Sequence, residues 1–245
     1  MKAPRACVLA AGKGTRMGGD RPKVLFEAGR KPLIEWCLKA LSAADVRDVV
    51  AVVGFRKDEV VSALPTGVRW VEQSPQLGTG HAVMCARVAF QGNDAPVLVT
   101  CGDMPLLSTG SFRKIAELRE RENAACALLT VRIPSDSRFG RIVRDGAGNV
   151  LRIVEYKDAT EEERAIDQGN TGVMCFRADD LWDALDLVKN ENAQGEYYLT
   201  DVIGILIASG KKVVAHVCEN PDEALGVNTP EDLAQVEKSL REKNG

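Results

Sequence analysis

Short apolar runs alternate with amphipathic stretches along most of this chain, and no other feature restricts its fold as much. The runs are five to eight residues long, and several consist almost entirely of Val, Leu and Ile. Such continuous runs are typical of strands in a sheet that is buried on both faces. The stretches between them have apolar residues three and four positions apart, which predicts helices. The alternation therefore predicts an α/β fold with a Rossmann-like, mostly parallel sheet flanked by helices.

The same pattern gives each element expected bounds. A final helix is predicted at about residues 229–243, because Thr229-Pro230-Glu231-Asp232 supplies an N-cap hydroxyl, a proline and two carboxylates. The other helices are expected at residues 32–43, 58–64, 80–90, 111–121, 179–189 and 198–209, and the strands at residues 6–11, 49–54, 68–72, 96–101, 126–133, 171–176 and 213–217.

Residues 140–155 break the alternation. They form two period-two runs around the turn Asp145-Gly-Ala-Gly-Asn149, which predicts an antiparallel hairpin inserted into the α/β domain. The length of 245 residues allows one large domain or two small ones. Because no Pro-, Gly- or Ser-rich linker and no internal repeat divides the chain, we expect a single domain over residues 1–245.

Charge and cysteine content exclude several classes of protein. With 32 Lys and Arg against 35 Asp and Glu, the chain lacks the broad positive field of a protein that binds duplex nucleic acid or a membrane surface. We therefore expect neither partner, and any phosphate site must be local. Seven cysteines without a Cys-x-x-Cys pair favour reduced thiols over disulfides or a zinc site. The apolar residues 6–11 are too few for a signal peptide or a membrane span, so we expect a cytoplasmic protein.

The loop at residues 12–23, which follows the first expected strand, is rich in glycine and carries two lysines and two arginines. Glycines let the backbone approach a phosphate closely, and the N–H groups with the flanking cations supply hydrogen bonds to it. The dinucleotide-binding pattern is broken by Met17, and the P-loop spacing is absent. The residues alone leave two interpretations open, a polyphosphate-binding loop and an ordinary glycine-rich turn.

A family resemblance narrows this choice. Leu9-Ala-Ala-Gly-Lys-Gly-Thr-Arg-Met17, followed by Pro22-Lys-Val-Leu25, resembles the signature of sugar-1-phosphate nucleotidyltransferases. Further motifs, over nearly the whole chain, resemble the N-terminal uridylyltransferase domain of the bacterial bifunctional N-acetylglucosamine-1-phosphate uridylyltransferase/glucosamine-1-phosphate acetyltransferase. These motifs are Gln73-Ser-Pro-Gln-Leu-Gly-Thr-Gly-His81, Gly102-Asp-Met-Pro-Leu106, Phe139-Gly-Arg-Ile142, Ile153-Val-Glu-Tyr-Lys-Asp158, Asn170-Thr-Gly172, Asn192-Ala-Gln-Gly-Glu-Tyr-Tyr-Leu-Thr-Asp201 and Gly226-Val-Asn228.

The resemblance implies a reaction in which a sugar 1-phosphate oxygen attacks the α-phosphorus of UTP and expels pyrophosphate. It implies N-acetylglucosamine 1-phosphate as the acceptor, UDP-N-acetylglucosamine as the product and Mg²⁺ as the metal. The attacking phosphate is ionised at neutral pH, so the protein must mainly align two anions and neutralise charge. On this resemblance Arg16, Lys23 and Asp103 are catalytic, and Asp103 and Asn228 bind the metal through oxygens that suit a hard cation.

The resemblance also implies the residues that bind each substrate. The Gln73 amide suits the O/N–H edge of uracil, and a glycine at position 78 lets the backbone close over the ring. His81 is expected to start a helix and make a structural hydrogen bond rather than to act as an acid or base. The nucleotide site is expected to contain Leu9, Ala10, Ala11, Gly12, Lys23, Gln73, Gly78, Thr79, Cys101 and Gly102, and the sugar site Gly140, Glu155, Asn170 and Thr200.

The sequence departs from the family pattern in two respects. Cys101 stands where some members carry tyrosine, which would alter the sugar pocket if that side chain contacts the ligand. The hexapeptide repeats of the acetyltransferase β-helix are not found in this sequence. We therefore expect no acetyltransferase domain in this chain, and a monomer or weak dimer rather than the family's trimer.

Other functions stay open at this stage. A uridylyl- or thymidylyltransferase for glucose 1-phosphate would share Arg16, Lys23 and Asp103. A non-catalytic module that senses nucleotide sugars would be free to lose these side chains, whereas all of them are present. A Rossmann oxidoreductase is disfavoured by Met17, which interrupts its glycine pattern.

Overall fold

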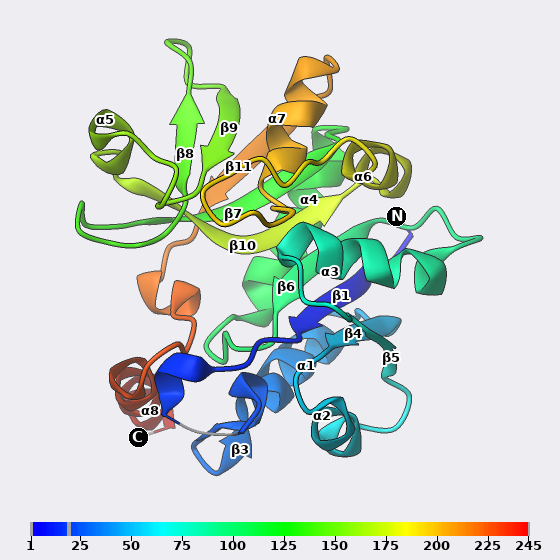
Figure 1. Cartoon of the computed structure of the whole chain (residues 1–245), viewed down its shortest axis with the longest axis vertical. Coiled ribbons are helices and arrows are strands. Elements are labelled where there is room, and N and C mark those ends of the chain that lie inside the picture. The colour runs from blue at the N-terminus through cyan, green and yellow to red at the C-terminus, as the bar shows by residue number, and fades with distance from the viewer. Residues whose placement is uncertain (1, 19–20, 245) are drawn as a thin grey trace.

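The continuous apolar runs form the central sheet of the molecule (Figure 1). The computed structural model describes residues 2–18 and 21–244. The strands of the main path follow the spatial order β11-β7-β10-β6-β1-β4-β5. Their bounds are β1 Arg5–Ala10, β4 Val49–Val53, β5 Arg69–Glu72, β6 Val97–Cys101, β7 Cys126–Arg132, β10 Gln168–Phe176 and β11 Val213–Val217.

Most neighbouring strands of this sheet run parallel. β1 pairs in parallel with β4 and β6, β4 with β5, and β11 with β7. β10 is the exception, because it runs antiparallel to both β6 and β7. The chain between β7 and β10 turns back through a hairpin instead of a crossover helix, and this return reverses the strand. The predicted α/β class with a mostly parallel sheet is confirmed, and the sheet is mixed.

The predicted hairpin is formed by β8 (Arg141–Arg144) and β9 (Val150–Val154), which pair antiparallel. Asp145 closes the turn, since its Oδ1 accepts hydrogen bonds from the backbone N–H groups of Ala147 (2.9 Å) and Asn149 (2.8 Å). β8 joins the main sheet through β10, where Arg141 stands opposite Gly169. The hairpin therefore extends the end of β10 that faces the cleft described below.

Helices cover both faces of the sheet (Figure 1). Alternate residues of β1 point to opposite faces, so Ala6 and Val8 join one core while Cys7 joins the other. The first core is covered by α1 (Leu33–Ala43), α2 (Lys57–Ala63) and α4 (Thr109–Arg121), and the second by α3 (Thr79–Ala86), α6 (Ala178–Leu185) and α7 (Asp201–Ala208).

The C-terminal helix α8 (Pro230–Asn244) packs against the segment of the chain that follows β1. Figure 1 shows it in red beside the blue N-terminal segment. Its Val236 and Leu240 are buried in a separate cluster with Met17, Ala28 and Leu33. The small sheet of β2 (Glu27–Ala28) and β3 (Lys31–Pro32) lies in the same region. The helix thus packs against the glycine-rich loop through the buried side chain of Met17.

Three expected helices differ from the structure by three or more residues at one end. The helix expected at 80–90 is divided into α3 and a 3-10 turn over Arg87–Phe90, and the one expected at 179–189 ends at Leu185. The helix expected from residue 198 begins at Asp201. Tyr197 stays outside the helix because its backbone is already paired, as its N–H donates to Leu77 O (2.8 Å) and its carbonyl accepts from Gly80 N (2.7 Å). A short helix at Glu161–Arg164, α5, was not expected.

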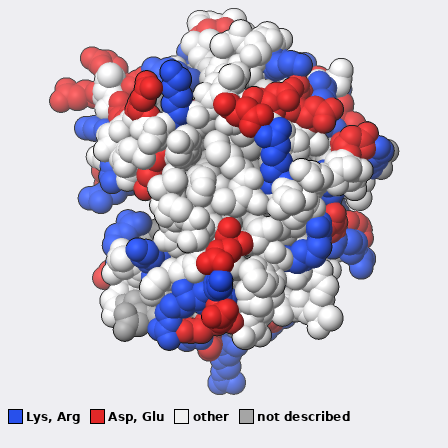
Figure 2. All heavy atoms as spheres, turned by 45° about the vertical axis from the view of Figure 1, so that its right-hand side comes forward, with Lys and Arg blue, Asp and Glu red and all other residues white. Residues whose placement is uncertain are grey.

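Charged side chains of both signs are mixed over the face shown in Figure 2, which shows no extended positive patch. This agrees with the nearly balanced charge of the sequence. Within residues 2–18 and 21–244, no helix combines the length and the apolar character needed to cross a bilayer.

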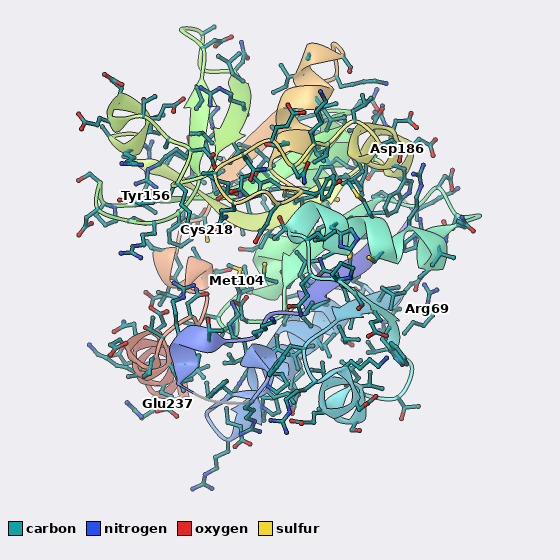
Figure 3. All side chains as sticks on the ribbon, viewed as in Figure 1. Arg69, Met104, Tyr156, Asp186, Cys218 and Glu237 are labelled. Carbon is teal, nitrogen blue, oxygen red and sulfur yellow. The ribbon has the colours of Figure 1, made fainter. Side chains whose placement is uncertain are left out.

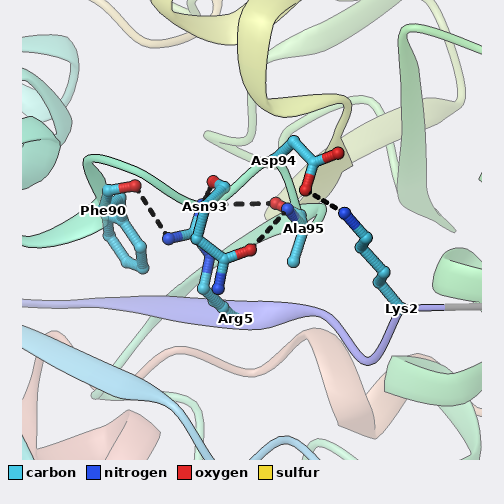
Figure 4. A network of polar contacts seen from close by, with 6 residues as sticks. All are labelled: Lys2, Arg5, Phe90, Asn93, Asp94 and Ala95. Atoms are coloured by element: carbon cyan, nitrogen blue, oxygen red, sulfur yellow. Dashed lines mark hydrogen bonds and ion pairs between the residues drawn. The ribbon is translucent and has the colours of Figure 1, made fainter.

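A buried arginine fastens the first residue of β1 to the loop before β6 (Figure 4). Arg5 is 3% exposed, and its guanidinium donates to the carbonyls of Phe90 (2.8 Å), Asn93 and Ala95 (3.4 Å). It also lies 4.9 Å from the centre of the Phe90 ring. Lys2 pairs with Asp94 nearby, but both of these side chains are exposed.

We predict that Arg5→Met lowers the free energy of unfolding by about 2 kcal/mol or more, because it leaves buried carbonyls without donors while the apolar stem is kept. Urea denaturation measures the change. Lys2→Met is the matched control and should have little effect, since it removes only an exposed ion pair. Equal stability of Arg5→Met and Lys2→Met would show that the buried network contributes nothing.

Candidate active site

Two adjoining cavities open at the carboxyl ends of β1 and β6. The smaller cavity has a volume of about 320 Å³ and the larger cavity about 560 Å³. They share four lining residues, which are Leu9, Thr79, Cys101 and Asp103. Ligands of open α/β sheets bind at the carboxyl ends of the strands. The two cavities therefore lie where this type of sheet places a binding site.

Four polar side chains from three distant parts of the sequence meet where the cavities join. Lys23 Nζ forms an ion pair with Asp103 Oδ2 and donates a hydrogen bond to Asn228 Oδ1 (3.0 Å). Arg16 Nη2 donates to the same oxygen of Asn228 (3.1 Å). The structure thus brings together the side chains that were predicted to be catalytic and metal-binding. Asp103 is 7% exposed, so its charge is held in a largely dehydrated position beside a cation.

The backbone around Asn228 fixes the direction of its amide. Asn228 Nδ2 donates to Gly226 O (3.0 Å), which turns Oδ1 toward Lys23. The N–H groups of Asn228 and Thr229 both donate to Asp232 Oδ2 (2.8 and 2.9 Å), and Thr229 Oγ1 accepts from Asp232 N (3.2 Å). This reciprocal cap at the start of α8 is the arrangement that Thr229-Pro-Glu-Asp232 suggested. Helix α8 therefore presents Asn228 to the cleft.

The donor set at this point fits a hard divalent cation. Asp103 Oδ2 and Asn228 Oδ1 contact the same ammonium, so they converge on one position that already carries a positive charge. Mg²⁺ prefers such oxygens, and it commonly takes one or two from the protein and the rest from water and phosphate. Within the described part of the chain, no cluster of three or more His, Cys, Asp and Glu side chains is placed to hold a metal. The pair therefore suits an ion shared with a bound phosphate.

The glycine-rich loop runs along the smaller cavity. Gly14 has a φ of +65°, and a Cβ on it would lie 3.1 Å from Lys23 Cβ, so a glycine lets the loop lie against the lysine backbone. Lys13 is exposed, and Arg21 contacts only Glu27 on the surface among the described residues. Gly19 and Asp20, which belong to the predicted loop, lie outside the described residues.

Most residues predicted for the nucleotide site line the smaller cavity. Ala10 does not, since it is buried in the core on one face of the sheet. Gly102 does not either, and a Cβ on it would lie 3.3 Å from Val24 and 3.4 Å from Ile34. Its N–H donates to Leu9 O (2.9 Å), so it contributes to the turn rather than to the wall. The predicted residues that do line the cavity are Leu9, Ala11, Gly12, Lys23, Gln73, Gly78, Thr79 and Cys101.

Close backbone contacts join the wall of the smaller cavity to the segment before α7. Gly78 has a φ of +106°, and a Cβ there would lie 2.7 Å from Tyr197 O. A Cβ on Gly80 would lie 2.9 Å from the same oxygen. Leu199 N donates to Thr79 Oγ1 (3.1 Å), so the Thr79 side chain is part of this contact. Only glycine permits such an approach at positions 78 and 80.

All four residues predicted for the sugar site line the larger cavity. Thr200 Oγ1 donates to Glu155 Oε1 (3.0 Å), and Asn170 N donates to Gly140 O (2.8 Å). A Cβ on Gly140 would lie 3.4 Å from Glu155 Oε2, so a glycine leaves room for that carboxylate. The structure therefore gathers Gly140, Glu155, Asn170 and Thr200 on one wall.

The sequence did not reveal two residues that shape these walls. Gln76 lines the smaller cavity, and its side chain donates to Ala11 O. Its position in the motif that begins at Gln73 could have identified it as a site residue. Arg141 is completely buried, and its guanidinium donates to the carbonyls of Ser135 (3.1 Å), Ser137 (2.7 Å), Phe139 and Arg164.

The contacts of Arg141 hold the loop that ends at Gly140. The ring of Tyr156, labelled in Figure 3, has Arg141 at 5.8 Å and Arg164 at 4.8 Å from its centre. Tyr156 follows Glu155 directly, so the same arginine braces both the Phe139–Gly140 and the Glu155 sides of the larger cavity. A charged residue in a period-two strand is usually solvent-facing, which is why sequence patterns do not single it out.

Burial and nearby carboxylates raise the pKa of Glu155 and of two residues close to it, Tyr198 and Asp201. Burial raises the pKa of Glu155 above its ordinary value, the hydrogen bond from Thr200 opposes this rise, and Asp201, Asp158 and Glu196 add to it. Burial also raises the pKa of Asp201, with Asp158 contributing, and raises the pKa of Tyr198 to about 12. Glu155 therefore keeps its proton to a higher pH in the folded chain than in the unfolded chain.

Cys101 lies where the two cavities meet. Burial raises the pKa of its thiol to about 12, with the Asp103 carboxylate adding to the rise and Lys23 opposing it. Its Sγ lies 3.6 Å from the position of a Cβ on Gly172. At neutral pH the side chain is therefore a neutral, small and weakly polar wall group rather than a nucleophilic thiolate.

We predict that Glu155→Gln changes the pH dependence of stability. Because the folded state holds the proton of Glu155 more tightly, wild-type stability falls as pH rises from about 4.5 through the raised pKa. The variant lacks this loss, so its stability relative to wild type should increase from pH 4 to pH 7 in urea denaturation. Thr200→Val should steepen the wild-type loss, since it removes a bond that favours the ionised carboxylate. A relative stability of Glu155→Gln that falls with pH would contradict the assignment.

Comparisons with known proteins place the chain in a family. Residues 6–184 match the MobA-like NTP transferase domain. The chain is 43% identical over 243 residues to the bifunctional protein GlmU of Brevibacillus brevis, and 45% identical over 238 residues to that of Limosilactobacillus fermentum. These matches cover 99% and 97% of this chain but 53% and 52% of the relatives. The chain therefore spans about half the length of the curated relatives it matches.

A solved structure shows the same fold. It is a Bacillus anthracis protein assigned as a glucose-1-phosphate thymidylyltransferase, crystallised with sucrose. The superposition has a TM-score of 0.79 and covers 98% of this chain and 96% of the other, at 21% sequence identity. This likeness concerns the fold alone. The match over residues 6–184 shows that the chain belongs to the MobA-like NTP transferase domain family.

Proposed function

We propose that this chain transfers a uridylyl group from UTP to N-acetylglucosamine 1-phosphate, forming UDP-N-acetylglucosamine and pyrophosphate. The observation that carries the proposal is the meeting of Lys23, Arg16, Asp103 and Asn228 where two cavities join. Two anionic substrates that react with each other need cations at their common boundary. The similarity to bifunctional GlmU proteins over nearly the whole chain supports the identity of the substrates.

In the proposed reaction, a phosphate oxygen of the sugar substrate attacks the α-phosphorus of UTP. One P–O bond forms, and the bond from the α-phosphorus to the bridging oxygen of pyrophosphate breaks. The attacking oxygen is already ionised, so no general base is needed. A magnesium ion bound by Asp103 and Asn228 would neutralise phosphate charge when present.

The protein's own part is to hold and align the substrates. Lys23 and Arg16 have cationic groups near the shared boundary, where charge shifts toward the leaving pyrophosphate. The smaller cavity takes the nucleotide, with Gln73, Gly78 and Thr79 beside the base. The larger cavity takes the sugar, with Glu155 and Asn170 hydrogen-bonding its hydroxyl and acetamido groups. We also propose that residues 1–245 act as one nucleotidyltransferase domain, since the two cavities share four lining residues.

A matrix of nucleotides and sugar 1-phosphates tests the function. Pyrophosphate release should be greatest with UTP and N-acetylglucosamine 1-phosphate, and about ten- to a hundredfold lower in kcat/KM with glucose 1-phosphate, because the groups that bind the acetamido would be left unpaired. Equal values, or a preference for glucose 1-phosphate or dTTP, would favour the alternative transferase. Binding of a nucleotide sugar without turnover would favour a sensing module.

We predict that Asp103→Ala lowers kcat by orders of magnitude in the presence of saturating Mg²⁺, because the metal loses its anionic protein ligand. Steady-state pyrophosphate release measures the effect. Asp94→Ala, which removes an exposed carboxylate in the loop before β6, is the matched control and should leave kcat unchanged. A variant at position 103 that keeps more than about a tenth of wild-type turnover, a barrier change of only about 1.4 kcal/mol, would remove Asp103 from the metal site.

A further inference from the structure

The side-chain amide nitrogen of Gln73 has two hydrogen-bond partners, and both belong to the protein. Gln73 is 5% exposed and lines the smaller cavity. Its Nε2 donates to the carbonyl of Gly78 (2.9 Å) and lies 3.2 Å from His81 Nδ1. A carbonyl oxygen only accepts hydrogen bonds, so the atom of the amide that faces Gly78 must be the nitrogen. The two acceptors together occupy both amide hydrogens.

This arrangement fixes the tautomer of His81. Because Gln73 Nε2 donates, His81 Nδ1 must be the unprotonated nitrogen, and the ring hydrogen must be on Nε2. Cys85 Sγ lies 3.8 Å from His81 Nε2 and 4.0 Å from His81 Nδ1, and the centre of the His81 ring lies 6.3 Å from that of Tyr197. The structural hydrogen bond expected for His81 at the start of a helix is present, and its partner is Gln73.

We propose that His81 is a positioning residue for base recognition. Together with the Gly78 carbonyl, it turns the Gln73 amide so that only Oε1 is offered to the nucleobase. This inference rests on the proposed function, since it takes the smaller cavity as the nucleotide site. The sequence suggested that the Gln73 amide both donates to and accepts from uracil. In this proposal it only accepts, through Oε1.

An acceptor at this position selects one class of base. The imide N3–H of uracil donates to Oε1, whereas N3 of cytosine carries a lone pair that Oε1 repels. UTP and CTP share ribose and triphosphate, so the ratio of their affinities reports on the contacts to N3 and to the group at C4, the two positions at which the bases differ. If His81 acted only by packing, its replacement would weaken both nucleotides by the same factor.

Titration calorimetry on the full chain tests the proposal with three proteins. Wild type should bind UTP more tightly than CTP. His81→Asn should keep that preference, because Oδ1 of asparagine stands near the place of Nδ1 and accepts from Gln73. His81→Phe keeps the ring shape without an acceptor and should lower the preference about tenfold, since an amide hydrogen is freed to donate to cytosine.

Nitrogen NMR of wild type provides a readout that needs neither a nucleotide nor His81→Phe. The chain has two histidines, so the His81 ring is identified by comparison with His81→Asn. An Nε2–H tautomer with unprotonated Nδ1 at pH 8 is the expected result, and an Nδ1–H tautomer would overturn the proposal even if His81→Phe failed to fold.

The outcomes separate this inference from the proposed function. An unchanged UTP preference in His81→Phe, or equal UTP and CTP affinities in wild type, would overturn the role of His81 while uridylyl transfer itself could still be observed. Wild type that binds neither nucleotide would overturn both. Loss of the preference in His81→Phe with its retention in His81→Asn would support the positioning role.

Discussion

The contact of Lys23 with Asp103 is the interaction on which the arrangement of the site depends. Asp103 sits just past the carboxyl end of β6, where its carboxylate is largely removed from water. A dehydrated carboxylate is costly unless a cation and hydrogen bonds compensate it. Lys23 supplies the charge and also contacts Asn228, so the sheet, the glycine-rich loop and the start of α8 are fastened at one point. The cationic groups of Lys23 and Arg16 are therefore already in place for a polyanionic ligand.

A second constraint joins the two walls of the cleft. The backbone of residues 77–80 is hydrogen-bonded to Tyr197, and the Thr79 side chain accepts from Leu199 N. Thr200, which follows directly, donates to Glu155 on the wall of the larger cavity. The part of the chain that lines the smaller cavity is therefore continuous, through a few direct bonds, with the part that lines the larger cavity. Movement of one wall would require these bonds to break.

Sequence patterns were enough to predict the sheet and the hairpin, because continuous apolar runs indicate the buried strands and period-two runs indicate the hairpin strands. They did not give the direction of β10, since periodicity carries no information about which way a strand runs. They placed a helix start at residue 198, but the tertiary backbone bonds of Tyr197 prevail over local helix preference there. The start of α8 was predicted correctly because it depends on local bonds, the reciprocal ones between Thr229 and Asp232.

The same sequence patterns could predict only part of the candidate site. The approach of Asp103 and Asn228, far apart in sequence, came from the family resemblance and from the rule that strand ends converge. Arg141 was not predicted because its four hydrogen-bond partners are backbone carbonyls, which every residue carries and which no sequence pattern can therefore identify. The orientation of Gln73 was likewise hidden, since it depends on Gly78 and His81 together.

If the larger cavity takes the sugar, as proposed, Cys101 bears on the choice of sugar because it lines both cavities. With its thiol protonated at neutral pH, it adds neither charge nor a strong hydrogen bond to the wall that it shares with Asp103. A tyrosine there, as in some members of the family, would bring both a ring and a hydroxyl into this space. In this chain the polar groups that face the larger cavity near the sugar are instead those of Glu155, Asn170 and Thr200. Under the proposed function we therefore expect discrimination between sugars to come from that wall, whose geometry rests on Arg141 and on the bond between Thr200 and Glu155.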